Sequence, residues 1–258
     1  MTVKRSQSAV RVLAVLEAIA RHQPIGVSML ARELGVDKSA TQRAIMTLAD
    51  EGWIRPALGL PTRWQLTARV LAVAHLGLSG NDLWRRARRT LEELRDQSGE
   101  TVLLTVQDLH GFVVMDVVES RQMLRTVPHI GMAVPVRGSA TSRVMLPHMN
   151  DERRLQILGE PPDSNLLEEF ARTRKRGFSV SKGEIASDST TIAAPILEMD
   201  GQPSGAVAIT APSKRMPATH HRTIGAMLCN AARTLSRGAI GAASHGAGSP
   251  GAGSPGAG

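Results

Sequence analysis

Two short helical segments separated by one glycine constrain the fold of the N-terminal region more than any other feature. Residues 29–34 and 38–51 each show apolar residues at helical spacing, and Gly35 lies between them. Ser28 and Asp37 are residue types that cap helix N-termini, so each helix is expected to begin directly after one of them. The pattern predicts a helix-turn-helix.

The sequence on either side of this pair extends the motif. An amphipathic helix is expected over residues 8–20, with Ser8 as its N-cap. Beyond the pair, residues 53–55 and 63–66 are short strand-like runs, and the stretch between them is rich in proline and glycine. A hairpin directly after a helix-turn-helix forms a wing. We therefore predict a winged helix-turn-helix domain over residues 6–66.

The second helix of the pair has an apolar inner face and a polar outer face, as a helix that enters the DNA major groove requires. Arginine suits guanine and glutamine suits adenine by bidentate geometry, and serine and lysine suit phosphates. A merely solvated helix face is the alternative for this helix taken alone. The candidate DNA-contacting residues are Lys38, Ser39, Gln42 and Arg43 on the helix, and Arg55 and Arg63 beside the wing.

The charge of the chain agrees with a polyanionic partner. The formal net charge is +8, and residues 1–80 hold ten Lys/Arg against five Asp/Glu. An uneven basic surplus of this kind is typical of an electrostatic DNA footprint. The single cysteine, Cys229, excludes a disulfide within one chain and a cysteine-based zinc site.

Other sequence signals restrict the cellular location and the kinds of chemistry that we expect of the protein. There is no run of 18 apolar residues and no signal-peptide pattern, so we expect a cytoplasmic protein without a membrane partner. There is no P-loop, dinucleotide fingerprint, nucleophile elbow or metal-ligand spacing. We therefore expect no cofactor, no metal and no catalytic residues.

The patterns in the remainder of the chain predict linker helices, an α+β domain and a tail. Helical patterns over 67–98 predict linker helices, and the repeats of Gly-Ala-Gly-Ser-Pro over 238–258 predict a disordered tail. Residues 99–237 mix β-branched runs with helical patterns, which predicts an antiparallel sheet packed against helices. Strands are expected over 101–106, 111–118, 123–128, 178–181, 191–197 and 204–211, and helices over 138–149, 151–158, 163–175 and 219–237.

Several segments occur in a specific order and spacing along the chain. They are Gln7-Ser8-Ala9-Val10, Leu34-Gly35-Val36-Asp37-Lys38-Ser39, Glu51-Gly52-Trp53-Ile54, Ser98-Gly99-Glu100-Thr101, Leu124-Arg125-Thr126-Val127-Pro128, Arg176-Gly177-Phe178 and Ile192-Ala193-Ala194-Pro195-Ile196. Together they resemble the IclR family of bacterial regulators over about residues 6–237. The resemblance implies a winged helix domain, a linker helix and a C-terminal effector-binding domain of GAF/PAS-like topology. It also implies dimers or tetramers on a palindromic operator in double-stranded DNA.

The same resemblance implies an effector pocket between the sheet and the helix expected over 138–149. Backbone N–H groups at the start of that helix attract carboxylates, and Arg143 adds charge there unless it forms a surface salt bridge. The effector is expected to be a small organic acid or an aromatic metabolite. For Thr191 and Thr210, the alternative is a purely structural role as threonines in the core of the sheet. The implied pocket residues are Ser139, Ala140, Thr141, Ser181, Thr191, Ala208 and Thr210.

The sequence therefore predicts a DNA-binding transcriptional regulator, most simply a repressor, whose operator binding responds to a small-molecule effector. One alternative is a winged helix protein whose C-terminal domain only mediates oligomerisation. A second alternative, from another class, is a small-molecule-binding enzyme with a vestigial winged helix. Departures from the family pattern, such as Ala40 after Lys38 and Ser39, leave the operator sequence undetermined.

Overall fold

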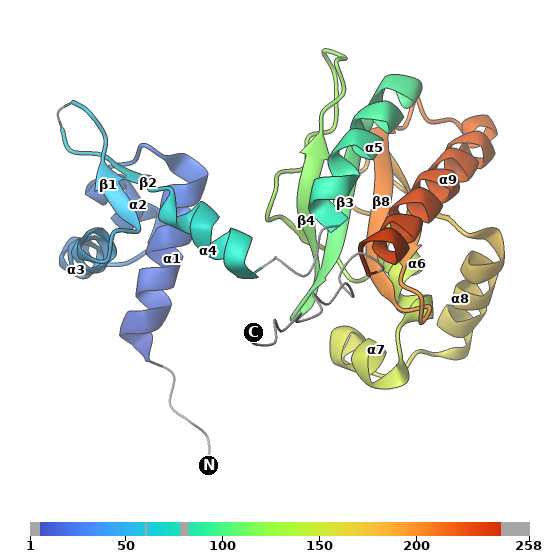
Figure 1. The fold of residues 1–258 in the computed structure, drawn as a ribbon, viewed down its shortest axis with the longest axis horizontal. Helices are drawn as coiled ribbons and strands as arrows, with labels where there is room; N and C mark the ends of the chain where they lie inside the picture. Colours follow the sequence, from blue (N-terminus) through green and yellow to red (C-terminus); the bar gives the residue numbers. More distant parts are fainter. Residues whose placement is uncertain (1–5, 60, 78–82, 244–258) are drawn as a thin grey trace, which may run out of the picture. The chain divides into compact units, whose positions relative to one another are not determined.

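The computed structural model describes residues 6–59, 61–77 and 83–243, and the chain divides into two compact units, Met1–Asn81 and Asp82–Gly258 (Figure 1). Part of the linker-helix region expected over 67–98, residues 78–82, and the tail from residue 244 onward lie outside the described residues. None of the described helices has the length and apolar character needed to cross a membrane.

The N-terminal unit is a helix-turn-helix with a wing, as predicted. Val15, Ile19, Leu30, Ile45 and Leu48 are buried and form the centre of its core. Because these apolar residues come from all three of the first helices, the helices pack around one aliphatic centre. The elements are α1 (Gln7–His22), α2 (Val27–Leu34), α3 (Lys38–Asp50), β1 (Ile54–Pro56), β2 (Trp64–Leu66) and α4 (Arg69–Gly77).

Helix caps in this unit confirm one prediction and correct two. The Asp37 carboxylate accepts a hydrogen bond from the Ala40 amide and caps α3. The cap of α1 is Ser6 rather than Ser8, because Ser8 already lies within the first helical turn. Helix α2 begins after Gly26 and has no side-chain cap, so Ser28 is its second residue and not its N-cap.

Gly35 makes the tight turn between α2 and α3. Its backbone is left-handed, with φ of 61°, and its amide donates back to the end of α2. Glycine adopts this conformation without the steric penalty that a Cβ imposes. Beyond α3, β1 and β2 pair antiparallel, with Ile54 opposite Leu66, which confirms the expected hairpin.

The C-terminal unit is built on a six-stranded antiparallel sheet with the strand order β5-β4-β3-β8-β7-β6. The two longest strands, β7 and β8, are neighbours and pair from Ser189 opposite Pro212 to Leu197 opposite Pro203. The strands are β3 (Thr101–Asp108), β4 (Gly111–Val118), β5 (Ala133–Val134), β6 (Ser179–Lys182), β7 (Ser189–Leu197) and β8 (Pro203–Pro212).

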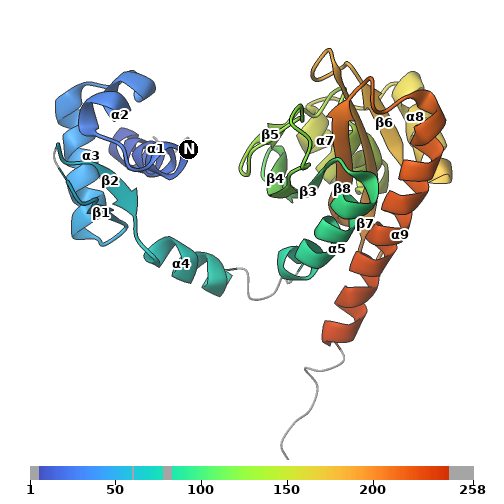
Figure 2. The ribbon, with the colours of Figure 1, turned by 90° about the horizontal axis from the view of Figure 1, so that it is seen from above.

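Helices cover both faces of this sheet. On one face, α5 (Leu83–Ser98) and α9 (Ala218–Ala243) lie side by side (Figures 1 and 2). Val102 and Leu104 belong to the core cluster that these helices form with the sheet, so their side chains point toward α5 and α9. Because side chains alternate along a strand, Leu103 points to the opposite face. That face packs against α6 (Ala140–Met145), a 3₁₀ turn (Leu146–His148) and α8 (Ser164–Arg176), with α7 (Asp151–Leu158) nearby in the chain.

Three expectations for this unit are wrong in detail. Residues 123–128 form no strand, because the Leu124 carbonyl accepts from Arg215 instead of a neighbouring strand, and the short edge strand is β5. The helix expected over 138–149 is α6 followed by the 3₁₀ turn, in which Pro147 has no amide to donate. Helix α9 continues to Ala243, past the expected start of the tail at residue 238.

Candidate DNA-contacting and ligand-binding sites

The N-terminus of α3 is organised by Asp37. Its Oδ1 accepts hydrogen bonds from the Ser39 hydroxyl and from the Ala40 amide, both at 2.7 Å. These donors, led by Ser39, lower the pKa of the Asp37 carboxyl. The carboxylate also stands at the positive end of the α3 dipole. The cap thus fixes both the start of α3 and the position of Ser39.

The outer face of α3 is polar and exposed. Lys38, Ser39, Gln42 and Arg43 are all exposed, while Ala40, Thr41, Ala44, Ile45 and Leu48 are buried against the rest of the unit. The guanidinium of Arg43 donates to the Ser39 hydroxyl at 3.3 Å. The structure therefore brings the four α3 positions predicted from sequence onto one face.

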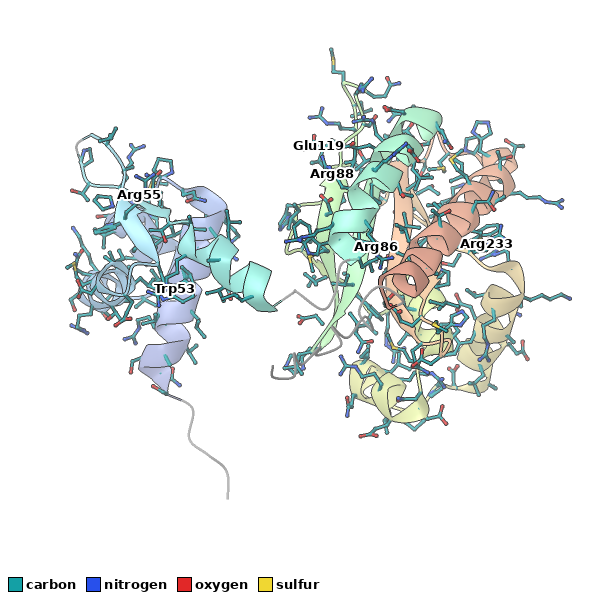
Figure 3. The ribbon with its side chains drawn as sticks, in the orientation of Figure 1. Trp53, Arg55, Arg86, Arg88, Glu119 and Arg233 are labelled. Atoms are coloured by element: carbon teal, nitrogen blue, oxygen red, sulfur yellow. The ribbon has the colours of Figure 1, made fainter. Side chains whose placement is uncertain are left out.

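The wing carries the other two predicted positions. Arg55 lies on β1 and is exposed (Figure 3). Arg63 is exposed directly before β2. The Ala57 amide donates to the Arg63 carbonyl at 2.8 Å, so the two arms of the hairpin stay paired beyond the short strands. At the base of the hairpin, the Arg69 guanidinium stacks 5.0 Å from the Trp53 ring. Met46 was not among the predicted DNA-contacting residues, but its half-exposed apolar side chain lies on the same face of α3 as Gln42 and Arg43.

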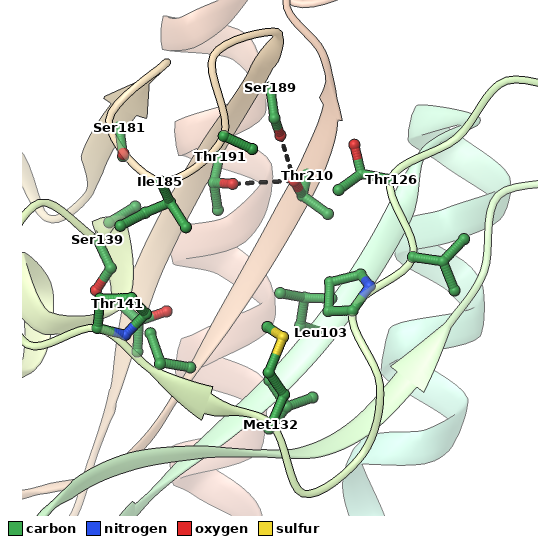
Figure 4. A pocket seen from close by; sticks show the side chains of 17 residues that line it. Leu103, Thr126, Met132, Ser139, Thr141, Ser181, Ile185, Ser189, Thr191 and Thr210 are labelled. Carbon is green, nitrogen blue, oxygen red and sulfur yellow. Dashed lines mark hydrogen bonds between the residues drawn. The ribbon is translucent and has the colours of Figure 1, made fainter.

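A cavity of about 240 Å³ lies in the C-terminal unit, against the sheet face that bears α6 (Figure 4). One wall is the 119–132 loop, which joins β4 to β5, and another is the turn between β6 and β7. Its lining residues are Leu103, Val114, Thr126, Val127, Pro128, Met132, Val134, Pro135, Ser139, Ala140, Thr141, Ser181, Ile185, Ala186, Ser189, Thr191 and Thr210.

Of the seven positions implied for the pocket, Ala208 does not line this cavity. It lies on the same face of β8 as Thr210 but is paired between Leu103 and Ala193 and is fully buried beneath α6. The family pattern places two neighbouring side chains of this strand in the pocket, and here the helix covers one of them. The other six positions all line the cavity.

Three hydroxyls form a chain on the β7 and β8 side of the cavity. The Thr191 hydroxyl donates to Thr210 Oγ1 at 2.9 Å, and Ser189 Oγ lies 3.2 Å from the same oxygen (Figure 4). The polar atoms of these threonines thus meet at the cavity wall. On the opposite side, the Ser139 hydroxyl caps α6 by accepting from the Ser142 amide, and it donates to Ser142 Oγ.

Arg143 does not line the cavity. Its guanidinium contacts Glu169 at 2.7 Å and Glu184 at 2.5 Å, and it donates to the Val180 carbonyl. Hydrogen bonding to Glu184, followed by the charge of Glu169, raises the pKa of Arg143 despite its partial burial. The expectation that Arg143 adds charge to the pocket is wrong, and the alternative of a salt bridge holds.

The cavity residues that sequence reasoning missed come mainly from irregular segments. Thr126, Val127, Pro128 and Met132 belong to the 119–132 loop, and Ile185 belongs to the turn after β6. A loop has no side-chain period, so no spacing in the sequence indicates which of its residues face inward. Within the described residues, no group of His, Cys, Asp and Glu has the arrangement of a metal site.

Comparisons with known proteins cover both units. The IclR helix-turn-helix domain matches residues 8–57, and the bacterial transcriptional regulator IclR C-terminal domain matches residues 75–237. The transcriptional repressor IclR of Escherichia coli is 28% identical over 244 residues, which are 89% of each chain. The regulator KdgR of Escherichia coli is 24% identical over 240 residues, covering 89% of this chain and 91% of KdgR.

Solved structures show the same fold. An IclR homologue of Microbacterium hydrocarbonoxydans, complexed with 4-hydroxybenzoate, superposes with a TM-score of 0.75 at 19% identity, over 91% of this chain and all of that one. The IclR of Thermotoga maritima superposes with a TM-score of 0.71 at 20% identity, over 90% and 98% of the two chains. The family consists of transcriptional regulators and not enzymes, and the matched domains span most of the chain: the protein belongs to the IclR family of DNA-binding bacterial transcriptional regulators.

Proposed function

We propose that the protein is a cytoplasmic repressor whose binding to a palindromic operator is modulated by a small organic acid or aromatic metabolite in the cavity. Two relatives named as repressors, IclR of Escherichia coli and the acetate operon repressor of Salmonella typhimurium, support the first half. The homologue complexed with 4-hydroxybenzoate supports the second. The protein acts as a homodimer or homotetramer, because two-fold pairing matches a palindrome.

The observation that carries the DNA-binding role is the division of α3 into a buried apolar face and an exposed polar face. In this proposal Gln42 and Arg43 contact base edges, and Lys38 and Ser39 contact phosphates. Ser39 already donates its proton to Asp37, so it meets a phosphate through a shared hydrogen bond or its backbone. Arg55 and Arg63 on the wing contact the minor groove or the sugar-phosphate backbone.

Binding of the purified protein to the DNA upstream of its own gene tests this role. The wild type should bind that DNA more tightly than scrambled DNA, and affinity should fall steeply with added salt. Arg43→Ala should weaken specific binding by about tenfold or more, since a bidentate base contact contributes about 1–3 kcal/mol. Arg222→Ala, at an exposed position on α9, is the matched control and should bind like the wild type. Equal binding by both variants would contradict the assignment of Arg43.

The sensor role rests on Thr191 and Thr210. Replacing both by valine keeps the shape and removes the two hydroxyls that meet at the cavity wall. The double variant should bind operator normally. In a screen of short organic acids and single-ring aromatics, it should respond less to the compounds that release the wild type from operator DNA. Thermal shift gives the matching binding measurement, because a ligand of the native state stabilises it. A response that stays unchanged would remove these threonines from the site.

A further inference from the structure

Among the described residues of α3, one large apolar side chain is exposed, and it lies on the polar outer face. This residue, Met46, is 44% exposed and is absent from the apolar clusters of the described core. Met46 follows Gln42 by four residues and Arg43 by three, and residues at these separations are neighbours on the surface of a helix. The two side chains proposed to contact base edges therefore have an apolar neighbour, one turn further along α3.

The charges along α3 place Met46 in the part of the helix that suits DNA. Within α3, Lys38 and Arg43 are basic and exposed, and the acidic residue Asp50 comes only at the last position. The Asp37 carboxylate before the helix is engaged by its own cap hydrogen bonds. Because phosphates attract the basic end and repel the acidic one, the N-terminal part of α3 is the part that enters the groove. Met46 lies one turn before Asp50, on the side of Arg43.

The major groove offers an apolar side chain one kind of apolar partner. Base pairs present hydrogen-bond donors and acceptors there, and the 5-methyl group of thymine is the apolar group among them. Methionine is unbranched and has three rotatable bonds, so its side chain can adapt to the position of such a methyl group. One helical turn advances about 5.4 Å and one base-pair step about 3.4 Å. Met46 therefore reaches a base pair one or two steps away from those that Gln42 and Arg43 contact.

We propose that Met46 reads one thymine in each half of the operator by packing against its 5-methyl group. This inference rests on the proposed DNA-binding function and adds a base to those that α3 reads. Gln42 and Arg43 recognise bases by hydrogen bonds, whereas Met46 does so by apolar contact. Cytosine at this position has no methyl group and presents an amino group that Met46 leaves without a good acceptor, so it is disfavoured.

Removing the methyl groups from the DNA tests this contact. The DNA upstream of the gene is made with thymine and, in parallel, with uracil, which pairs in the same way and lacks only the 5-methyl group. Fluorescence anisotropy with the full-length wild type measures the two dissociation constants. The uracil DNA should bind about tenfold more weakly, because the loss of a methyl contact costs about fourfold and occurs in both halves of the operator.

Variants of Met46 separate this contact from other effects of the missing methyl groups. Met46→Ala should weaken binding to the thymine DNA and should bind both DNAs with nearly equal affinity. Met46→Leu keeps an apolar side chain of similar volume and should retain most of the preference for thymine. Met199→Ala removes an exposed methionine from the turn between β7 and β8, so it is the matched control and should keep the full preference. Thermal melting by circular dichroism shows that each variant is folded.

Single replacements in a synthetic operator then locate the base. Each thymine is exchanged for uracil in turn, and binding is measured with the wild type and with Met46→Ala. One position in each half of the operator should account for the loss of affinity in the wild type. The same two replacements should have almost no effect on Met46→Ala, because that variant has already lost the side chain that meets the methyl group.

The outcomes are distinct. A preference for thymine that Met46→Ala abolishes, and that Met46→Leu and Met199→Ala keep, supports the inference. Equal binding of both DNAs by the wild type overturns it and leaves the DNA-binding function standing. A preference that is as large in Met46→Ala as in the wild type also overturns it, because another residue then meets the methyl groups. If the wild type binds neither DNA better than scrambled DNA, the proposed DNA-binding function itself is contradicted, and this inference with it.

Discussion

Helix α3 and the cavity of the C-terminal unit are built in opposite ways. The polar residues of α3 that face outward lie within two turns of one helix, whose start is fixed by Asp37. The cavity draws its lining from strands of both halves of the sheet, from α6 and from two irregular segments. The α3 face is basic and exposed, whereas the cavity is lined by apolar and hydroxyl-bearing side chains.

This difference determines how each site responds to change. A substitution on the outer face of α3 removes one contact and leaves the helix in place, because its packing depends on the other face. A substitution near the cavity acts on a shape that several segments maintain together. Substitutions on the exposed face of α3 should therefore leave the fold intact while weakening DNA binding. The cavity, in contrast, should be sensitive to substitutions at residues that never touch a ligand.

The largest expected effect comes from the buried face of α3. Ile45→Ala removes a fully buried side chain from the core of the N-terminal unit and should lower the free energy of unfolding of that unit by about 2–5 kcal/mol. Chemical denaturation measures this loss, and operator binding should fall with it. Binding of aromatic probes to the cavity should stay unchanged. A parallel loss of probe binding would show that the two sites do not respond separately.

The same contrast explains what the sequence could predict. The start of α3 follows from Asp37 and the turn from Gly35, because caps and left-handed glycines act within a few residues. The cap of α1 was misplaced by two residues, since Ser6 and Ser8 are chemically equivalent and only the backbone selects one. The fold class, the family and the polar face of α3 were therefore accessible from local patterns.

The cavity was accessible only in part, through the family resemblance. That resemblance indicated six residues that line it, yet it included Ala208, because covering by α6 depends on packing between distant segments. The 119–132 loop escaped prediction altogether: its apolar residues suggested a strand, while Arg215 holds its Leu124 carbonyl. Which hydroxyls meet at the cavity wall, such as those of Thr191 and Thr210, can be decided only once the three-dimensional contacts are known.

An intermediate effect is expected at Arg215, which does not line the cavity. Its guanidinium donates to both oxygens of Glu100, at 2.5 and 2.7 Å, and to the Leu124 carbonyl at 2.9 Å. Arg215→Gln breaks the bidentate pair and should cost about 1–3 kcal/mol of stability. Hydrogen exchange should quicken at the amides of the 119–132 loop, and probe affinity should drop.

The control for Arg215 is another arginine at the same loop. Arg125 pairs with Glu119 at 2.9 Å, and both side chains are well exposed, so Arg125→Gln should have little effect on stability or exchange. If Arg125→Gln and Arg215→Gln accelerate exchange equally, the loop is not held by Arg215. If neither does, the cavity wall depends on local contacts and resembles α3 more closely than proposed.

The smallest expected effect is electrostatic and lies at the cap of α3. The pKa of Asp37 is lowered chiefly by the Ser39 hydroxyl and then by the Ala40 amide, so its ionised form is favoured in the folded state. A carboxyl with a lowered folded pKa stabilises the protein above its unfolded pKa, near 3.9, and this contribution disappears as pH falls through the folded value.

Asp37→Asn keeps a good capping residue and removes only the charge. The variant should therefore melt slightly below the wild type between pH 6 and 7, and the gap should close below about pH 4. A gap that persists at low pH would mean that the hydrogen-bond geometry of the cap, and not its charge, positions Ser39 and the start of α3.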